Sequence, residues 1–148
     1  MPEVVVDNSV AVKWYLPEEH ADYAAVLLLT EFRLNAPDLI VAEMANVLWR
    51  KTLTGGLSHQ EAGDIASGLS RQGVQLHALS PLMTHALELS VTANHPAYDC
   101  FYLALALHLG GTCVTADRRF YDAFARRYPD TMVWIEDLTS GVEEPART

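Results

Sequence analysis

The sequence feature that most constrains the fold is a short apolar run near the start of the chain, Val4–Val6, which ends abruptly at Asp7. Three consecutive β-branched residues favour a strand that is buried on both faces, as in a parallel sheet. Asn8 and Ser9 follow the acid, and both residue types cap helices or shape turns. An acid at the carboxyl end of such a strand lies where open α/β sheets bind their ligands. Asp7 is therefore either the cap of the next helix or part of a ligand site.

Strand-like and helix-like segments alternate along the rest of the chain, which predicts a three-layer α/β domain with a mostly parallel central sheet. We expect a single domain over residues 1–138, followed by a polar, loose tail over residues 139–148. The expected strands are 4–6, 32–36, 74–79, 112–115 and 133–135. The expected helices are 10–16, 18–30, 39–54, 58–70, 80–93, 97–109 and 118–127.

Composition limits the function classes. The 148 residues include 19 acids against 10 Lys and Arg, a net charge of −9, which argues against a nucleic-acid binder that uses a broad basic face. An enzyme that meets phosphates through metal ions remains compatible with this charge. No apolar run is long enough to span a membrane and no signal peptide is evident, so we expect a cytoplasmic protein. Cys100 and Cys113 lie in apolar segments and are expected to be buried, reduced thiols.

Four acids fall at or beside segments that we expect to be buried. Asp7 and Asp117 each follow a strand, Asp99 lies in the first turn of the most apolar helix, and Glu43 lies in the second turn of an amphipathic helix. Buried carboxylates are costly unless they are paired or bound to a cation. One shared ion would satisfy all four, and a carboxylate cluster selects a hard ion such as Mg²⁺ or Mn²⁺.

Each acid also has a purely structural explanation. The two strand-end acids could cap the helices that follow them. Asp99 could be a favourable charge at a helix N-terminus. Glu43 could pair with Arg50 or Lys51 on a solvated helix face. All four explanations holding at once is much less plausible than any one of them.

The chain resembles the PIN-domain ribonucleases and, among them, the VapC-type toxins of bacterial toxin–antitoxin pairs. The resemblance covers nearly the whole chain and rests on four motifs in the family's order: Val4-Val-Val-Asp7-Asn-Ser9, Leu39-Ile-Val-Ala-Glu43-Met-Ala-Asn46-Val-Leu48, Ala97-Tyr-Asp99-Cys-Phe-Tyr-Leu-Ala104 and Val114-Thr-Ala-Asp117. Each motif alone is weak, and the four in register are specific for the fold.

The resemblance implies a Mg²⁺-dependent endoribonuclease with an α/β/α PIN-like fold, a partner antitoxin and a homodimeric state. It makes Asp7, Glu43, Asp99 and Asp117 the acidic quartet. Asp7 and Asp99 are expected to contact the metal directly. Glu43 and Asp117 would bind the metal through water, complete the ligand set of a second ion, or act on the attacking water. The resemblance also implies three secondary site residues, which match family positions near the acids: Asn8, Ser9 and Thr115.

Several other side chains have two explanations each. Lys13, Arg118 and Arg119 could steer RNA or be ordinary surface charge. Asp122 is expected to face solvent, and His95 is expected to be a turn residue because it precedes a proline. For a group of aromatic residues near the expected site we favour core packing over base stacking: Trp14, Tyr15, Trp49 and Tyr98.

Two other functions fit a similar sheet. One is a catalytically silent PIN-like binding module, against which the presence of all four acids argues. The other is a phosphotransfer enzyme or phosphoaspartate receiver. The segment after Asp7 lacks the second acid that a haloacid-dehalogenase-type phosphatase carries two residues on, and the acid pair of a receiver is also missing.

Overall fold

The central layer is a five-stranded sheet. The computed structural model describes residues 1–29 and 31–138, and within them every pair of neighbouring strands is parallel. The strand order is β3-β2-β1-β4-β5, which puts the expected first strand at the centre. The strands are β1 (Glu3–Val6), β2 (Arg33–Pro37), β3 (Gln75–His77), β4 (Thr112–Thr115) and β5 (Met132–Trp134).

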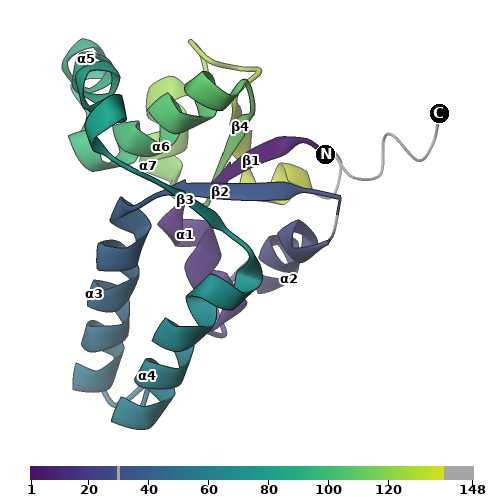
Figure 1. Ribbon diagram of the computed structural model, residues 1–148, viewed down its shortest axis with the longest axis vertical. Coiled ribbons are helices and arrows are strands. Elements are labelled where there is room, and N and C mark those ends of the chain that lie inside the picture. Colours follow the sequence, from purple (N-terminus) through teal and green to yellow (C-terminus); the bar gives the residue numbers. More distant parts are fainter. Residues whose placement is uncertain (30, 139–148) are drawn as a thin grey trace.

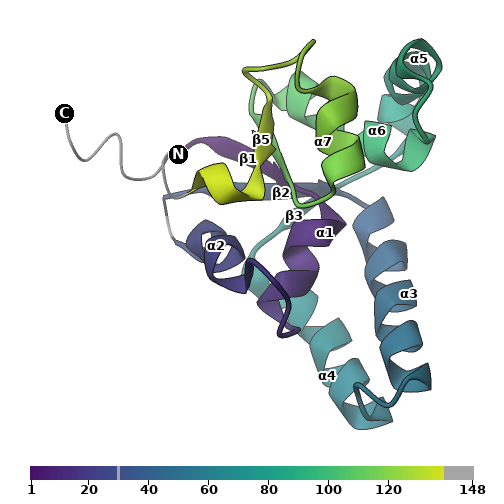
Figure 2. The same cartoon turned by 180° about the vertical axis from the view of Figure 1, so that it is seen from behind.

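Helices cover both faces of this sheet, as Figures 1 and 2 show, so the predicted three-layer architecture is confirmed. One face carries α1 (Asn8–Ala11), α2 (Ala21–Ala25), α3 (Leu39–Leu53) and α4 (His59–Gly68). The other face carries α5 (Met83–Ala93), α6 (Ala97–Leu109) and α7 (Arg118–Phe124). Short 3-10 segments complete the fold: Val12–Trp14, Val26–Leu28, Leu69–Gln72, Ser80–Leu82 and Ile135–Asp137.

The strand order has one point where the winding reverses. From β1 the chain moves outward to β2 and β3, and it then returns to place β4 on the other side of β1. Because parallel crossovers are right-handed, this reversal sends the following helices to the opposite face. The crevice between the carboxyl ends of β1 and β4 is therefore the topological switch point, where open α/β sheets bind ligands.

Helix α6 is the buried core helix that its apolar sequence predicts. Six of its residues are fully buried: Cys100, Tyr102, Leu103, Ala104, Leu105 and Ala106. It packs on β1, β2 and β4 from one side and on α5 from the other. Both cysteines are buried and unbridged, as expected.

Two expected helices begin elsewhere. The helix expected at 10–16 begins at Asn8 and passes into a 3-10 turn that ends at Trp14. The helix expected from residue 18 begins only at Ala21, because His20 takes a left-handed conformation with φ 67° that breaks the helix before it. The acids expected in that first turn lie outside it, and Glu18 instead pairs with Lys13 at 3.4 Å.

The remaining differences concern element ends. Helix α7 ends at Phe124 rather than Arg127, and β5 lies one residue earlier than expected. The helix expected at 80–93 begins with a 3-10 turn, and α5 itself starts at Met83. Strand β3 is shorter than expected. The expected tail at 139–148 lies outside the described residues.

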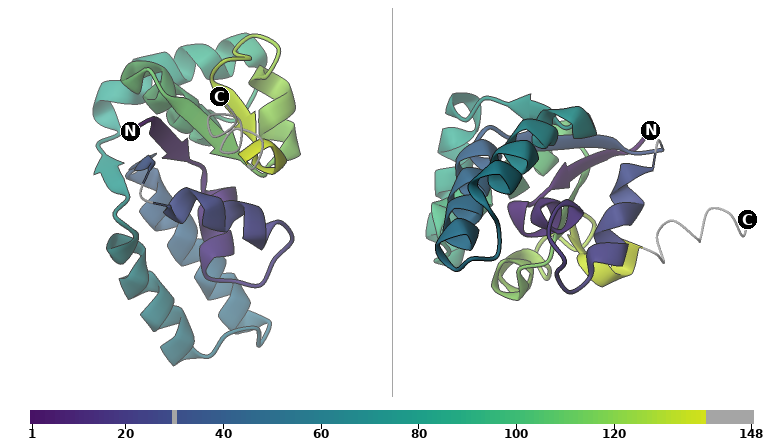
Figure 3. Two further views of the ribbon diagram at one scale, coloured as in Figure 1. Left: turned by 90° about the vertical axis from the view of Figure 1, so that its right-hand side faces the viewer. Right: turned by 90° about the horizontal axis from the view of Figure 1, so that it is seen from below.

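Helices α3 and α4 form a hairpin that projects away from the sheet (Figures 1 and 3). A capping box at Ser58 starts α4: the Ser58 hydroxyl accepts from the Glu61 N–H at 3.0 Å, and the Glu61 carboxylate accepts from the Ser58 N–H at 2.8 Å. No residue of α4 is fully buried. Among the described residues, no helix combines the length and apolar character that crossing a membrane requires.

Two glycines, Gly110 and Gly111, form the turn between α6 and β4. Gly110 takes a left-handed conformation with φ 65° and closes α6. Gly111 follows in close contact with β1, and a β-carbon placed there would overlap the carbonyl oxygen of Glu3. Only glycine lets β4 begin this close to β1.

Candidate functional site

The candidate site lies at the carboxyl ends of β1 and β4, at the switch point. Val6 pairs with Val114 in the parallel register, so Asp7 and Thr115 follow on neighbouring strands at the same edge. The backbone N–H of Asp7 also donates to the carbonyl oxygen of Val114 at 3.1 Å. The register thus brings together two motifs that are more than one hundred residues apart.

Asp7 is held by two hydroxyl groups. Ser9 Oγ and Thr115 Oγ1 donate to Asp7 Oδ2 at 2.6 and 2.7 Å. Both hydroxyls are oriented in turn, because they accept hydrogen bonds from the backbone N–H groups of Ala116 and Asp117. The Asp7 side chain makes no capping bond to α1, so the helix-cap explanation fails for this residue.

Glu43 reaches the site from α3. Its Oε1 accepts a 2.5 Å hydrogen bond from the hydroxyl of Tyr102 on α6, on the opposite face of the sheet. Burial raises the pKa of Tyr102 far above its usual range, so the phenol stays protonated and remains a donor. Within the described residues Glu43 forms no ion pair, and the expected alternative of Arg50 or Lys51 is wrong.

Asp99 lies in the first turn of α6, as expected, and its partner is His95. The His95 Nε2 atom lies 2.7 Å from Asp99 Oδ2. The imidazole is stacked on Phe120 and meets Phe124 edge to face, and the side chain is only 9% exposed. His95 does follow a turn, but its role beside Asp99 was missed. The available signal was the four-residue separation of His95 and Asp99 across the start of α6.

Asp117 caps α7. Its Oδ1 accepts from the backbone N–H groups of Arg119 and Phe120 at 3.0 and 3.2 Å. The cap explanation is therefore right for this acid. A capping bond also fixes where the carboxylate lies, directly after β4 and beside the other acids.

The acids interact electrostatically, which shows that they form one cluster. Burial raises the pKa of Asp7 from 3.8 to about 7; the hydroxyls of Ser9 and Thr115 lower it, and the charges of Asp99 and Glu43 raise it. Burial is the largest cause, and the repulsion from the other carboxylates adds to it.

Two more members of the cluster respond in the same way. Burial raises the pKa of Glu43, the hydrogen bond from Tyr102 lowers it, and the charge of Asp99 raises it. Burial also raises the pKa of Asp99, His95 lowers it, and the charge of Asp117 raises it. Each of the four acids therefore lies close enough to another to affect its proton affinity.

The donor set fits a hard divalent cation. Carboxylate oxygens at a partly buried edge repel each other, and a cation between them would remove that repulsion. Within residues 1–29 and 31–138, no group of three or more His, Cys, Asp or Glu side chains is arranged so that its own atoms could hold a metal ion. An ion that keeps several water ligands, as Mg²⁺ does, suits such an open arrangement.

The secondary candidates differ in their relation to the cluster. Ser9 and Thr115 touch Asp7, while the amide oxygen of Asn8 is buried without a hydrogen-bond partner among the described residues. Lys13 is paired with Glu18. Arg119 is exposed and its charge lowers the pKa of Asp99, so it lies beside the site.

The remaining candidates are surface residues. Arg118 pairs with Asp122 at 3.2 Å and lies over the Trp134 ring, so Asp122 faces solvent as expected. Core packing is wrong for Trp49 and Tyr98, which are 55% and 66% exposed. Trp14 and Tyr15 are partly buried against the core, in line with the favoured expectation.

An acidic cluster at the switch point of a parallel α/β/α sandwich is the arrangement that the sequence motifs indicated. The family model of the PIN domain matches residues 4–124, which contain all four acids. The chain therefore belongs to the PIN-domain family. Ribonuclease VapC3 of Pyrobaculum aerophilum is 30% identical over 124 residues, which cover 82% of this chain and 95% of that protein. Within the family the chain falls among the VapC ribonucleases.

Solved structures share the fold. PAE2754 from Pyrobaculum aerophilum has a TM-score of 0.72 at 21% identity, covering 97% of this chain and 90% of that chain. VapC20 of Mycobacterium tuberculosis, a sarcin-ricin loop cleaving toxin, has a TM-score of 0.64 at 17% identity and coverages of 82% and 95%. VapBC2 from Rickettsia felis, bound to a promoter DNA fragment, has a TM-score of 0.63 at 11% identity and coverages of 89% and 98%.

Proposed function

We propose that this chain is a Mg²⁺-dependent endoribonuclease that acts as the toxin of a toxin–antitoxin pair, with Mn²⁺ as an alternative ion. The observation that carries the proposal is the convergence of four carboxylates at the switch point, three of them with raised pKa values. The VapC3 relative is named a ribonuclease, and VapC20 is described as a toxin that cleaves the sarcin-ricin loop, which supports RNA as the substrate.

In this proposal Asp7 and Asp99 bind the ion, and Glu43 and Asp117 hold the water around it. When bound, a carboxylate-held Mg²⁺ supplies an activated water and neutralises charge on the phosphoryl oxygens. The chain's own contribution is orientation. Ser9 and Thr115 fix Asp7, Tyr102 fixes Glu43, His95 fixes Asp99, and the start of α7 fixes Asp117.

Cleavage assays test this function. The wild-type protein should cut structured RNA in Mg²⁺ and stop in EDTA, and Asp7→Asn should be inactive in both conditions. Asp64→Asn, which removes an exposed carboxylate on α4, is the matched control and should retain activity. Equal cutting by wild type and Asp7→Asn in chelator would refute the proposed enzymatic activity, and the catalytically silent binding module would then be the better explanation.

The partner in this proposal is an antitoxin, and the toxin itself is a homodimer. The VapBC2 structure supports the first part, since it is a two-protein assembly on promoter DNA. The second part rests on an exposed apolar stripe of α5, where Met83, Leu87 and Val91 recur every four residues and are 62%, 55% and 73% exposed. A matching exposed row on α3 contains Val41, Trp49 and Leu53.

A further inference from the structure

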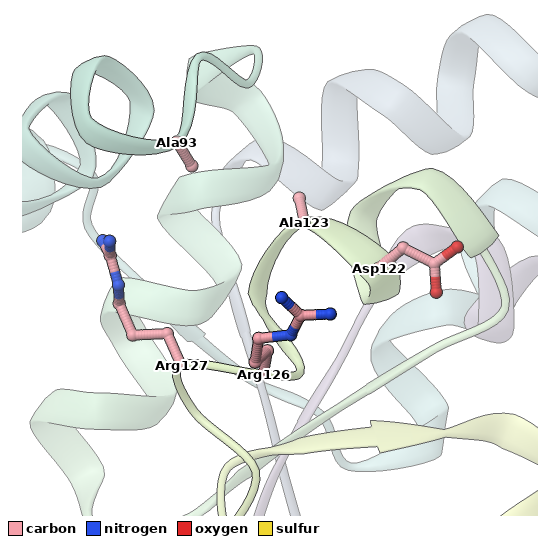
Figure 4. Close-up of a pocket in the computed structure, with 5 residues that line it drawn as sticks. All are labelled: Ala93, Asp122, Ala123, Arg126 and Arg127. Atoms are coloured by element: carbon pink, nitrogen blue, oxygen red, sulfur yellow. The ribbon is translucent and has the colours of Figure 1, made fainter.

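A cavity of about 620 Å³ lies between the end of α5 and the second half of α7. Figure 4 shows its lining: Ala93, Asp122, Ala123, Arg126 and Arg127. The two alanines are small, which leaves room between the helices. The two arginine side chains extend from the turn that follows α7, on either side of this space. The cavity therefore combines open volume with two guanidinium groups.

These guanidinium groups are not neutralised within the part of the chain that the structure describes. Neither Arg126 nor Arg127 forms an ion pair there, and both are exposed. Asp122 is engaged with Arg118. In a chain with a net charge of −9, two adjacent unpaired arginines make a local anion-attracting site.

The cavity adjoins the acidic cluster along two elements. Helix α7 begins directly after Asp117 and ends at Phe124, and the two arginines lie in the turn that follows it. Ala93 is followed closely by His95, which contacts both Asp99 and Phe124. The cavity is therefore connected to the acidic cluster through α7, which begins directly after Asp117, and through the short segment that joins Ala93 to His95.

We propose that this cavity is a subsite for a backbone phosphate of the RNA substrate, away from the phosphate that is cleaved. Guanidinium forks donate to phosphate oxygens in pairs, and such contacts position a strand without reading its sequence. The two arginines attract the negatively charged RNA backbone, which the carboxylates of the acidic cluster repel. The inference rests on the proposed function only in taking RNA as the ligand.

Binding without cleavage tests the subsite. A fluorescein-labelled oligouridylate is titrated with the full chain in EDTA, at several NaCl concentrations, and anisotropy gives Kd. Arg126→Gln/Arg127→Gln should weaken binding about tenfold, because charge-assisted hydrogen bonds are lost. It should also lower the slope of log Kd against log[NaCl] by about 0.7, the value for one phosphate on a single strand. Arg126→Lys/Arg127→Lys should keep the salt slope, because the positive charges remain. It should lose part of the affinity, because lysine cannot form the paired hydrogen bonds of a guanidinium group.

The matched control removes two arginines that line a cavity away from the acidic cluster, beside Met1 and Leu27–Leu29, as Arg33→Gln/Arg71→Gln. This control should bind as the wild type does. The subsite is refuted if Arg126→Gln/Arg127→Gln binds the oligouridylate with the same Kd and the same salt slope as the control. It is also refuted if this variant keeps its affinity for RNA and loses affinity only for an acidic protein partner. If wild type never cuts RNA in Mg²⁺ but the Arg126/Arg127 variant still loses binding, the nuclease fails and the subsite stands.

Discussion

Replacing Asp7 by Asn should stabilise the metal-free protein, and the gain should depend on pH. The substitution keeps the shape of the side chain and an oxygen that can accept from Ser9 and Thr115. It removes a carboxyl that is 4% exposed and whose pKa burial raises from 3.8 to about 7. The variant therefore isolates the cost of burying this one charge.

The magnitude follows from proton linkage. Below pH 4 the carboxyl is protonated in both the folded and the unfolded chain, so its ionisation costs nothing. Between pH 4 and pH 7 only the unfolded chain ionises, so the free energy of unfolding falls as pH rises. Above pH 7 the loss levels off at about 4 kcal/mol, at 1.36 kcal/mol for each pH unit between the two pKa values.

The assay is urea unfolding in EDTA, followed by circular dichroism from pH 4 to pH 8. The advantage of Asp7→Asn over wild type should grow by about 4 kcal/mol across this range, which corresponds to roughly 8–16 °C in Tm. Mg²⁺ at about one hundred times its Kd should then return about 2.7 kcal/mol to wild type and nothing to the variant. Asp122→Asn is the control for loss of a surface carboxylate. A stability difference between wild type and Asp7→Asn that stays constant with pH would refute the reasoning.

Three further substitutions probe the residues that hold the site and the proposed dimer. Tyr102→Phe removes the donor to Glu43 and should lower cleavage about 10–100-fold at fixed Mg²⁺, as loss of an outer hydrogen-bond partner at a metal site does; unchanged cleavage would show that Glu43 needs no support. His95→Ala should raise the Mg²⁺ concentration for half-maximal cleavage about 10–100-fold, with partial recovery in His95→Gln, whereas a purely structural residue would lower activity without moving that midpoint. Leu87→Glu on the exposed face of α5 should convert a dimer to a monomer in light scattering, and a monomeric wild type would contradict the proposed homodimer.

The sequence predicts the elements that carry the acids well, because those elements have strong local signals. The valine run of β1, the apolar α6 and strand β4 after it all occur as expected. The start of α2 was not predictable, because a left-handed His20 has no clear local signal. The partners of Glu43 and Asp99 were missed for different reasons. Tyr102 meets Glu43 only through tertiary packing, and His95 was assigned to its turn alone.

Exposure was the least predictable property. Trp49 and Tyr98 lie on helices with apolar neighbours, so local periodicity favoured burial for both. Whether an apolar helix face is covered depends on which elements pack beside it, and that information is spread over the whole chain. The same limit applies to the Arg126/Arg127 cavity, which local patterns do not reveal because Ala93 ends α5 and the arginines follow α7.

The close contact of Gly111 with Glu3, at the amino ends of β4 and β1, affects the positions of residues at the carboxyl ends of the same two strands. Thr115 lies four residues further along β4, about 13 Å away at the usual rise per residue. Because Gly111 sets how near β4 starts to β1, it also sets where the Thr115 hydroxyl meets the Asp7 carboxylate. A methyl group added at Gly111, at the amino end of β4, would therefore displace the Thr115 hydroxyl oxygen from its position beside Asp7. Loss of catalysis in such a variant would arise from strand spacing, without any change to a residue that touches the substrate.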